Sequence, residues 1–64
     1  MTLHEVREIL RGRCDECGSQ ALWGMRNNIS PGYISDVLNE RREPGPAVLS
    51  ALKIRRTTTY EWEA

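Results

Sequence analysis

Residues 19–39 read SQALWGMRNNISPGYISDVLN, and their pattern predicts two short helices separated by a tight turn. Ser19 and Ser30 are well placed as N-caps, because a serine hydroxyl can accept a hydrogen bond from an amide in the first helical turn. Pro31 follows the second cap at the first helical position, where its missing N–H costs nothing. Asn28 tolerates the left-handed backbone that the turn needs. The stretch therefore has the layout of a helix-turn-helix.

Further helices are expected on both sides of this segment. Thr2 and Glu5 have the spacing of a capping box, and Gly18 is suited to end the helix that starts there. The predicted helices are residues 2–17, 20–27, 31–38 and 46–53. Apolar residues at helical spacing predict the core: Leu3, Val6, Leu10, Cys14, Cys17, Ile34, Val37, Leu38, Val48, Leu49 and Leu52.

This pattern resembles the helix-turn-helix of the Cro and lambda-repressor-like superfamily, which includes many small phage and prophage regulators. The resemblance covers roughly residues 3–54. The matching positions are Ser19-Gln20, Ile29-Ser30, Tyr33-Ile34-Ser35 and Leu38-Asn39, followed by the loop and fourth helix of residues 41–52. The expected fold is an all-α, four- to five-helix lambda-repressor-like helix-turn-helix domain over residues 1–56. A short C-terminal β-strand or tail over residues 57–64 would follow it.

Three positions depart from the family pattern. Gly24 stands where the family usually has alanine, and glycine inside a helix costs about 1 kcal/mol. Asn28 replaces the usual turn glycine, which is a tolerable exchange. Glu40 stands where the family commonly has glycine, directly after the second helix of the motif. In a complex with DNA, its charge would face the phosphates.

The resemblance implies that the second helix of the motif enters the DNA major groove. The residues that it places at double-stranded DNA are Gln20, Ser30, Gly32, Tyr33, Ser35 and Asp36, with Arg41 and Arg42 on flanking phosphates. These residues are poorly suited to hydrogen-bond base edges, because the helix offers no Arg for guanine and no Asn or Gln for adenine on that face. Asp36 could accept a hydrogen bond from cytosine but would repel phosphates. Tyr33 has an alternative role as a partly buried packing residue.

The charges are unevenly distributed along the chain, although they sum to zero. Nine basic and nine acidic residues give the chain no formal net charge. Residues 41–56, directly after the recognition helix, nevertheless hold five basic residues and one acidic residue. This block is either a solvated loop or a set of phosphate contacts.

The last residues change in character. Residues 57–62, TTTYEW, are rich in β-branched and aromatic types, and Thr58, Tyr60 and Trp62 would share one face of a strand. A single strand in a helical chain has no internal partner, so its exposed edge predicts pairing with a second copy. The alternative is a frayed tail. The expected assembly is a homodimer.

Cys14 and Cys17 form a CxxC pair, which supplies only half of a structural zinc site. The only histidine, His4, lies about three helical turns away. Both thiols fall on the apolar stripe of the first helix, where cysteine behaves as a small hydrophobic residue. We therefore expect structural cysteines and no bound metal.

The sequence predicts no catalytic residue, cofactor or small-molecule substrate. It contains no Gly-x-Ser-x-Gly elbow, no phosphate loop and no ligand-spaced cluster of His, Asp and Glu. No apolar run approaches the length of about 18 residues that a membrane span needs, and no signal segment opens the chain. The expected location is the cytoplasm.

Two functions remain open at this point. The first is a sequence-specific DNA-binding regulator, a Cro-like repressor that binds a palindromic operator as a dimer. The alternative is a helix-turn-helix scaffold used as a protein-interaction module, such as a phage-encoded inhibitor or adaptor of a host protein. The resemblance favours the first function, whereas the zero net charge, Asp36, Glu40 and the weak base readers favour the alternative.

Overall fold

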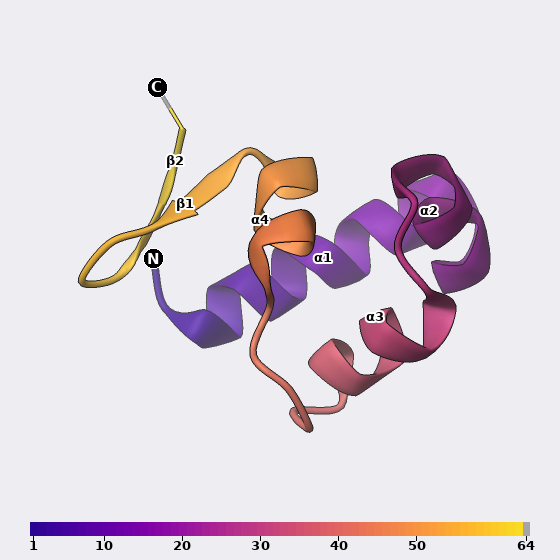
Figure 1. Cartoon of the computed structure of the whole chain (residues 1–64), viewed down its shortest axis with the longest axis horizontal. Coiled ribbons are helices and arrows are strands. Elements are labelled where there is room, and N and C mark those ends of the chain that lie inside the picture. The colour runs from indigo at the N-terminus through magenta and orange to yellow at the C-terminus, as the bar shows by residue number, and fades with distance from the viewer. Residues whose placement is uncertain (64) are drawn as a thin grey trace.

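Within residues 1–63, which the computed structural model describes, four helices precede a small β-hairpin (Figure 1). The helices are α1 (Leu3–Cys17), α2 (Gln20–Asn27), α3 (Pro31–Leu38) and α4 (Pro46–Leu52). The strands β1 (Ile54–Arg56) and β2 (Tyr60–Trp62) form an antiparallel two-stranded sheet. The mainly helical class expected from the sequence is confirmed. No helix in these residues is both long and apolar enough to cross a membrane.

Three of the four predicted helix starts are confirmed by side-chain caps, whereas α4 begins after Gly45 without one. The Thr2 hydroxyl accepts from the Glu5 amide at 3.2 Å, and the Glu5 carboxylate accepts from the Thr2 amide at 3.1 Å. The Thr2 hydroxyl also donates to the Glu5 carboxylate at 3.2 Å, and the pKa of Glu5 is lowered because the Thr2 amide and hydroxyl both favour the ionised carboxylate. Ser19 and Ser30 cap α2 and α3, and each hydroxyl accepts from the amide three residues later at 3.1 Å.

The turn residues were also predicted correctly. Gly18 ends α1 with a φ of 116°, a conformation that strains any residue with a Cβ atom. Asn28 ends α2 in the left-handed conformation, with a φ of 56°. Three residues, from Asn28 to Ser30, therefore connect α2 to α3.

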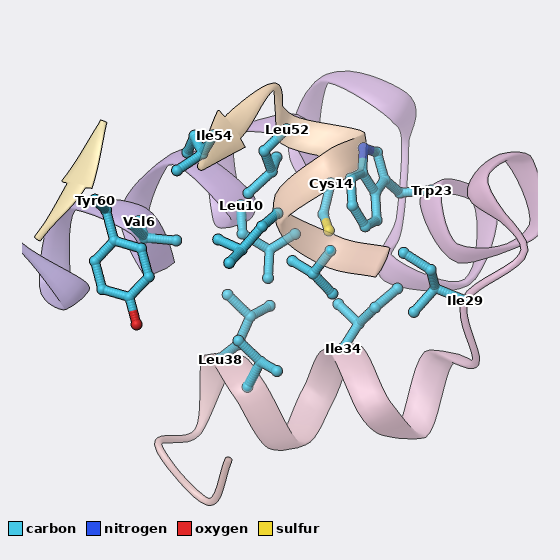
Figure 2. Close-up of a cluster of buried hydrophobic side chains, with 13 residues drawn as sticks. Val6, Leu10, Cys14, Trp23, Ile29, Ile34, Leu38, Leu52, Ile54 and Tyr60 are labelled. Atoms are coloured by element: carbon cyan, nitrogen blue, oxygen red, sulfur yellow. The ribbon is translucent and has the colours of Figure 1, made fainter. Parts of the chain in front are cut away.

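The core lies between α1, α3 and α4, and α2 and the hairpin add to it at opposite ends (Figure 2). Nine of the eleven predicted core residues are buried, whereas Leu3 and Cys17 are half-buried. For α2 the sequence pattern favours burial of Ala21, of Trp23 or Leu22, and of part of Met25. Trp23 is buried, whereas Ala21, Leu22 and Met25 are exposed. The buried hydrophobic residues of the core that the sequence did not assign to it are Ile29, Ile54 and Tyr60.

The C-terminal strand has a partner inside the chain, so the expectation of a single unpaired strand was wrong. Lys53 takes a φ of 61° after α4 and turns the chain back toward the core. Ile54 then lies opposite Trp62, and Arg56 lies opposite Tyr60. The expected domain boundary after residue 56 falls in the turn of this hairpin.

The three residues assigned to a shared dimer face differ in their surroundings. Thr58 lies in the turn and is exposed, whereas Tyr60 is only 8% exposed and belongs to the core. Trp62 keeps 49% of its surface accessible. Tyr60 is buried because the hairpin folds against the start of the chain, where Figure 1 places the N-terminus beside β2. The Met1 ammonium donates to the Tyr60 carbonyl, and the Tyr60 amide donates to the Met1 carbonyl at 3.2 Å.

Candidate nucleic-acid interface

The packing of α2 on the turn explains the glycine at position 24. A Cβ atom there would lie 2.4 Å from the Ile29 carbonyl oxygen and 2.9 Å from Cδ1 of Ile34. The Ile29 amide donates to the Gly24 carbonyl at 2.8 Å, and the Ile29 side chain is buried. Because the backbone of the turn approaches α2 so closely, the helix needs a residue without a side chain at this position.

The helix α3 presents one face to the core and another outward. Ile34, Val37 and Leu38 are buried. The exposed predicted residues are Gln20, Ser30, Gly32, Arg41 and Arg42, and the half-buried ones are Tyr33, Ser35 and Asp36. The outward face of α3 therefore carries the predicted DNA residues of that helix, none of which is fully buried.

Tyr33 anchors the loop between α3 and α4. Its hydroxyl accepts from the Gly45 amide at 2.8 Å and donates to the Glu43 carbonyl at 3.4 Å. A Cβ atom at Gly45 would lie 2.5 Å from this hydroxyl oxygen, so the glycine permits the contact. The structure thus shows the packing role that the sequence left open for Tyr33.

Ser35 is held by the residue one helical turn later. The Asn39 side-chain amide donates to the Ser35 hydroxyl at 3.1 Å and to the Ser35 carbonyl at 2.9 Å. These contacts fix the hydroxyl at the half-buried edge of the outward face. Asn39 is therefore a supporting residue for Ser35.

Asp36, Arg41 and Arg42 form an ion-paired cluster at the end of α3. Nη1 of Arg41 lies 3.7 Å from Oδ1 of Asp36, and Nε of Arg42 lies 3.4 Å from Oδ2. The Arg42 guanidinium also lies 5.6 Å from the centre of the Tyr33 ring. Sequence reasoning placed these residues at DNA but did not foresee that they pair with one another.

Arg7 of α1 is a residue of this region that sequence reasoning missed. Its Nε donates to the Val37 carbonyl at 2.8 Å, and its Nη2 donates to the Arg42 carbonyl at 3.2 Å. Its Nη1 lies 3.8 Å from the Glu40 carboxylate. Glu40 itself takes a φ of 62°, a left-handed conformation that glycine adopts more readily. Arg7 therefore fixes the chain where α3 ends.

The two thiols lie on α1, and both are free. Cys14 belongs to the core, whereas Cys17 is half-buried. Burial raises the pKa of Cys14, and the charges of Asp15 and Cys17 raise it further. Among residues 1–63, no three His, Cys, Asp or Glu side chains are grouped in a way that could hold a metal ion.

The outward face of α3 and the arginines that follow it form the candidate interface. Two other helices support this interface. Arg7 of α1 donates to the end of α3, and α2 supplies the surface against which the turn packs. Comparison of the chain with protein-family models, curated proteins and solved structures gives no significant match.

Proposed function

We propose that this chain is a sequence-specific DNA-binding regulator that inserts α3 into the major groove. The observation that carries this proposal is the close contact of Gly24 with the turn, which holds α2 and α3 as one rigid pair. The pair leaves Gly32, Ser35 and Asp36 outside the core. A helix held in this way can approach base edges, because the major groove is wide enough to admit it.

The start of α2 supplies a phosphate contact in this proposal. The Ser19 hydroxyl accepts the hydrogen bond of the Leu22 amide. The amides of Gln20 and Ala21, in the first turn of α2, have no partner within the helix. Helix amides of this kind attract anions, and the exposed Gln20 side chain can add a hydrogen bond. Gln20 would thus set the register of the protein on the duplex without reading its sequence.

Two copies would bind a palindromic operator and repress transcription by occupying it. A dimer reads two half-sites separated by one turn of DNA, about 34–36 Å. The exposed face of the hairpin, which includes Trp62, is the surface that we assign to the contact between copies.

The test is a fluorescence titration against the DNA that flanks the gene of this protein, repeated with random-sequence DNA and at several salt concentrations. A Ser35→Ala change should reduce the preference for the operator by about 1–3 kcal/mol, because it removes a base contact. Arg42→Ala should weaken both DNAs about equally and lower the salt slope by about one contact.

Ser50→Ala is the matched control for this titration, because Ser50 is exposed on α4 and outside the interface. It should change neither affinity. Equal binding of operator and random DNA by the native chain and by the Ser35 variant would refute the assignment of α3 as the recognition helix.

A protein-interaction module is the second candidate, favoured by a specific observation on α2. Met25 is 74% exposed and Leu22 is 45% exposed, which leaves apolar surface on that helix. Binding to a protein partner through this surface would depend weakly on salt, whereas DNA binding falls steeply as salt rises. The same titration therefore discriminates between the two functions.

A further inference from the structure

The Asp36 carboxylate lies between the guanidinium groups of two arginines that follow α3. One carboxylate oxygen lies 3.7 Å from Arg41 and the other lies 3.4 Å from Arg42. A carboxylate resembles a phosphodiester in presenting two anionic oxygens, and arginine binds both with the same planar fork. The Asp36 carboxylate therefore has the chemistry of the anion that these arginines would meet on DNA.

We propose that Asp36 is an internal substitute for a DNA phosphate. In the unbound protein it occupies Arg41 and Arg42, and a phosphate of the DNA backbone must displace it. The inference rests on the proposed function for the identity of the displacing anion. Its consequence is that Asp36 weakens binding to any DNA, regardless of sequence.

The backbone around the cluster is already in place for this exchange. The amides of Arg41 and Arg42 both donate to the Asp36 carbonyl, at 2.8 and 3.3 Å. Nη2 of Arg7 also donates to the Arg42 carbonyl at 3.2 Å. Only the two arginine side chains need to move when the carboxylate is replaced.

The ion pairs are weak enough to be exchanged. The side chains of Arg41 and Arg42 are 72% and 59% exposed, and that of Asp36 is 33% exposed. Pairs this open to water are screened and contribute little to stability. A negatively charged phosphate of the DNA duplex can therefore displace the carboxylate without disturbing the fold.

The test compares Asp36→Asn with Glu40→Gln, a neighbouring change that removes the same charge. Glu40 pairs with Arg7 and forms no ion pair with either of the two arginines in the described residues. Binding to a random-sequence duplex is measured between about 50 and 200 mM salt, where phosphate contacts dominate the affinity. The Asp36 variant should bind roughly 2- to 30-fold more tightly, since two exposed ion pairs no longer compete. Its salt slope should change by less than about one contact, because both arginines already reach phosphates in the native complex, and Glu40→Gln should raise the affinity less.

A second comparison places Asp36→Asn in a chain that already carries Arg41→Gln and Arg42→Gln. The gain should disappear there, because no arginine remains to be released. A gain that persists in this background, or one that Glu40→Gln reproduces in full, shows that only net charge matters and overturns the proposal. Weaker binding by Asp36→Asn also overturns it, because the carboxylate would then contribute a contact of its own.

Elution from a heparin column keeps this test separate from that of the proposed function. Heparin is a polyanion without base sequence, so elution from it reports the charge of the protein surface without any base reading, and the two variants compared differ in net charge from the native chain by the same amount. Asp36→Asn should elute at higher salt than Glu40→Gln, and equal elution overturns the inference. If the two variants elute in this order but the native chain does not prefer its operator, only the proposed function is refuted.

Discussion

At the level of single residues, two glycines in helices have opposite surroundings. A Cβ atom at Gly24 would meet the Ile29 backbone at 2.4 Å, whereas one at Gly12 would meet nothing within 4 Å. Helix propensity favours alanine at both positions by about 1 kcal/mol. Whether replacing each glycine by alanine stabilises or destabilises the fold is therefore decided by the space around that glycine.

We expect Gly24→Ala to destabilise the fold by about 1–3 kcal/mol, because the turn must move away from α2. Gly12→Ala is the matched control and should stabilise α1 by up to about 1 kcal/mol. Urea unfolding of both variants measures the difference. A Gly24→Ala chain as stable as the native one would show that the turn does not pack tightly on α2.

The two cysteines should differ in their reactivity toward a thiol reagent. Cys14 is 2% exposed and its pKa is raised, so little thiolate is present or accessible at neutral pH. Cys17 is half-buried and should react first. Mass spectrometry after iodoacetamide treatment should show one modified thiol in the folded chain and two in denaturant. Equal rates for both thiols in the folded chain would contradict the placement of Cys14 in the core.

The raised pKa of Cys14 also predicts a dependence of stability on pH. The folded chain keeps the thiol protonated above the ordinary value of 9.0, whereas the unfolded chain loses the proton there. The unfolded state thus binds fewer protons, and the contribution of Cys14 to stability falls as the pH rises above that value. Thermal unfolding between neutral and alkaline pH should show this loss in the native chain, and a smaller one in Cys14→Ala.

At the level of helices and strands, local signals in the sequence were sufficient for the helices and insufficient for the hairpin. Ser19, Ser30 and Thr2 act within three residues of themselves, so their role as caps can be predicted from sequence spacing alone. The partner of β2 could not be found in this way. Lys53 has no marked preference for positive φ, yet its conformation directs Ile54 into the core and creates β1.

The candidate site shows the same division between local and distant contacts. Helical periodicity accounts for the buried face of α3, whereas the residues of its outward face were named as DNA contacts only by the family resemblance. The ion pairs of Asp36 depend on the reversal of the chain after α3, and the Arg7 contacts join residues 30 and 35 positions apart. Such contacts are set by tertiary packing, for which a single sequence carries no periodic signal.

The loop between α3 and α4 should loosen when the Tyr33 hydroxyl is removed. Tyr33→Phe loses the hydrogen bonds to Gly45 and Glu43, at an expected cost of about 0.5–1.5 kcal/mol. Exchange of the Gly45 amide proton, followed by NMR, should become faster. Tyr60→Phe removes a hydroxyl from the hairpin instead and should leave that exchange unchanged. Equal protection of Gly45 in both variants would mean that the loop is held by other contacts.

At the level of the whole molecule, self-association should depend on Trp62 if the hairpin forms the contact between copies. Deleting residues 57–64 is a poor test, because it also removes Tyr60 from the core and would cost about 3–5 kcal/mol. Trp62→Ser removes exposed apolar surface without opening the core. Sedimentation velocity should show a shift from dimer to monomer for this variant.

Met25→Ser is the control for that experiment, since Met25 is even more exposed but lies on α2. It should leave the oligomeric state unchanged. If Trp62→Ser sediments like the native chain, the hairpin does not carry the dimer contact.

The contact between Met1 and Tyr60 has a consequence for how the chain is made. It joins residues 59 positions apart, and Ile54 and Tyr60 complete the core. During synthesis, α1 to α4 leave the ribosome before the hairpin, so the nascent chain carries an open core until residues 54–60 emerge. A translation product cut short before the hairpin would expose that apolar surface to proteases. A chain that lacks the hairpin should therefore be degraded faster than one that carries it.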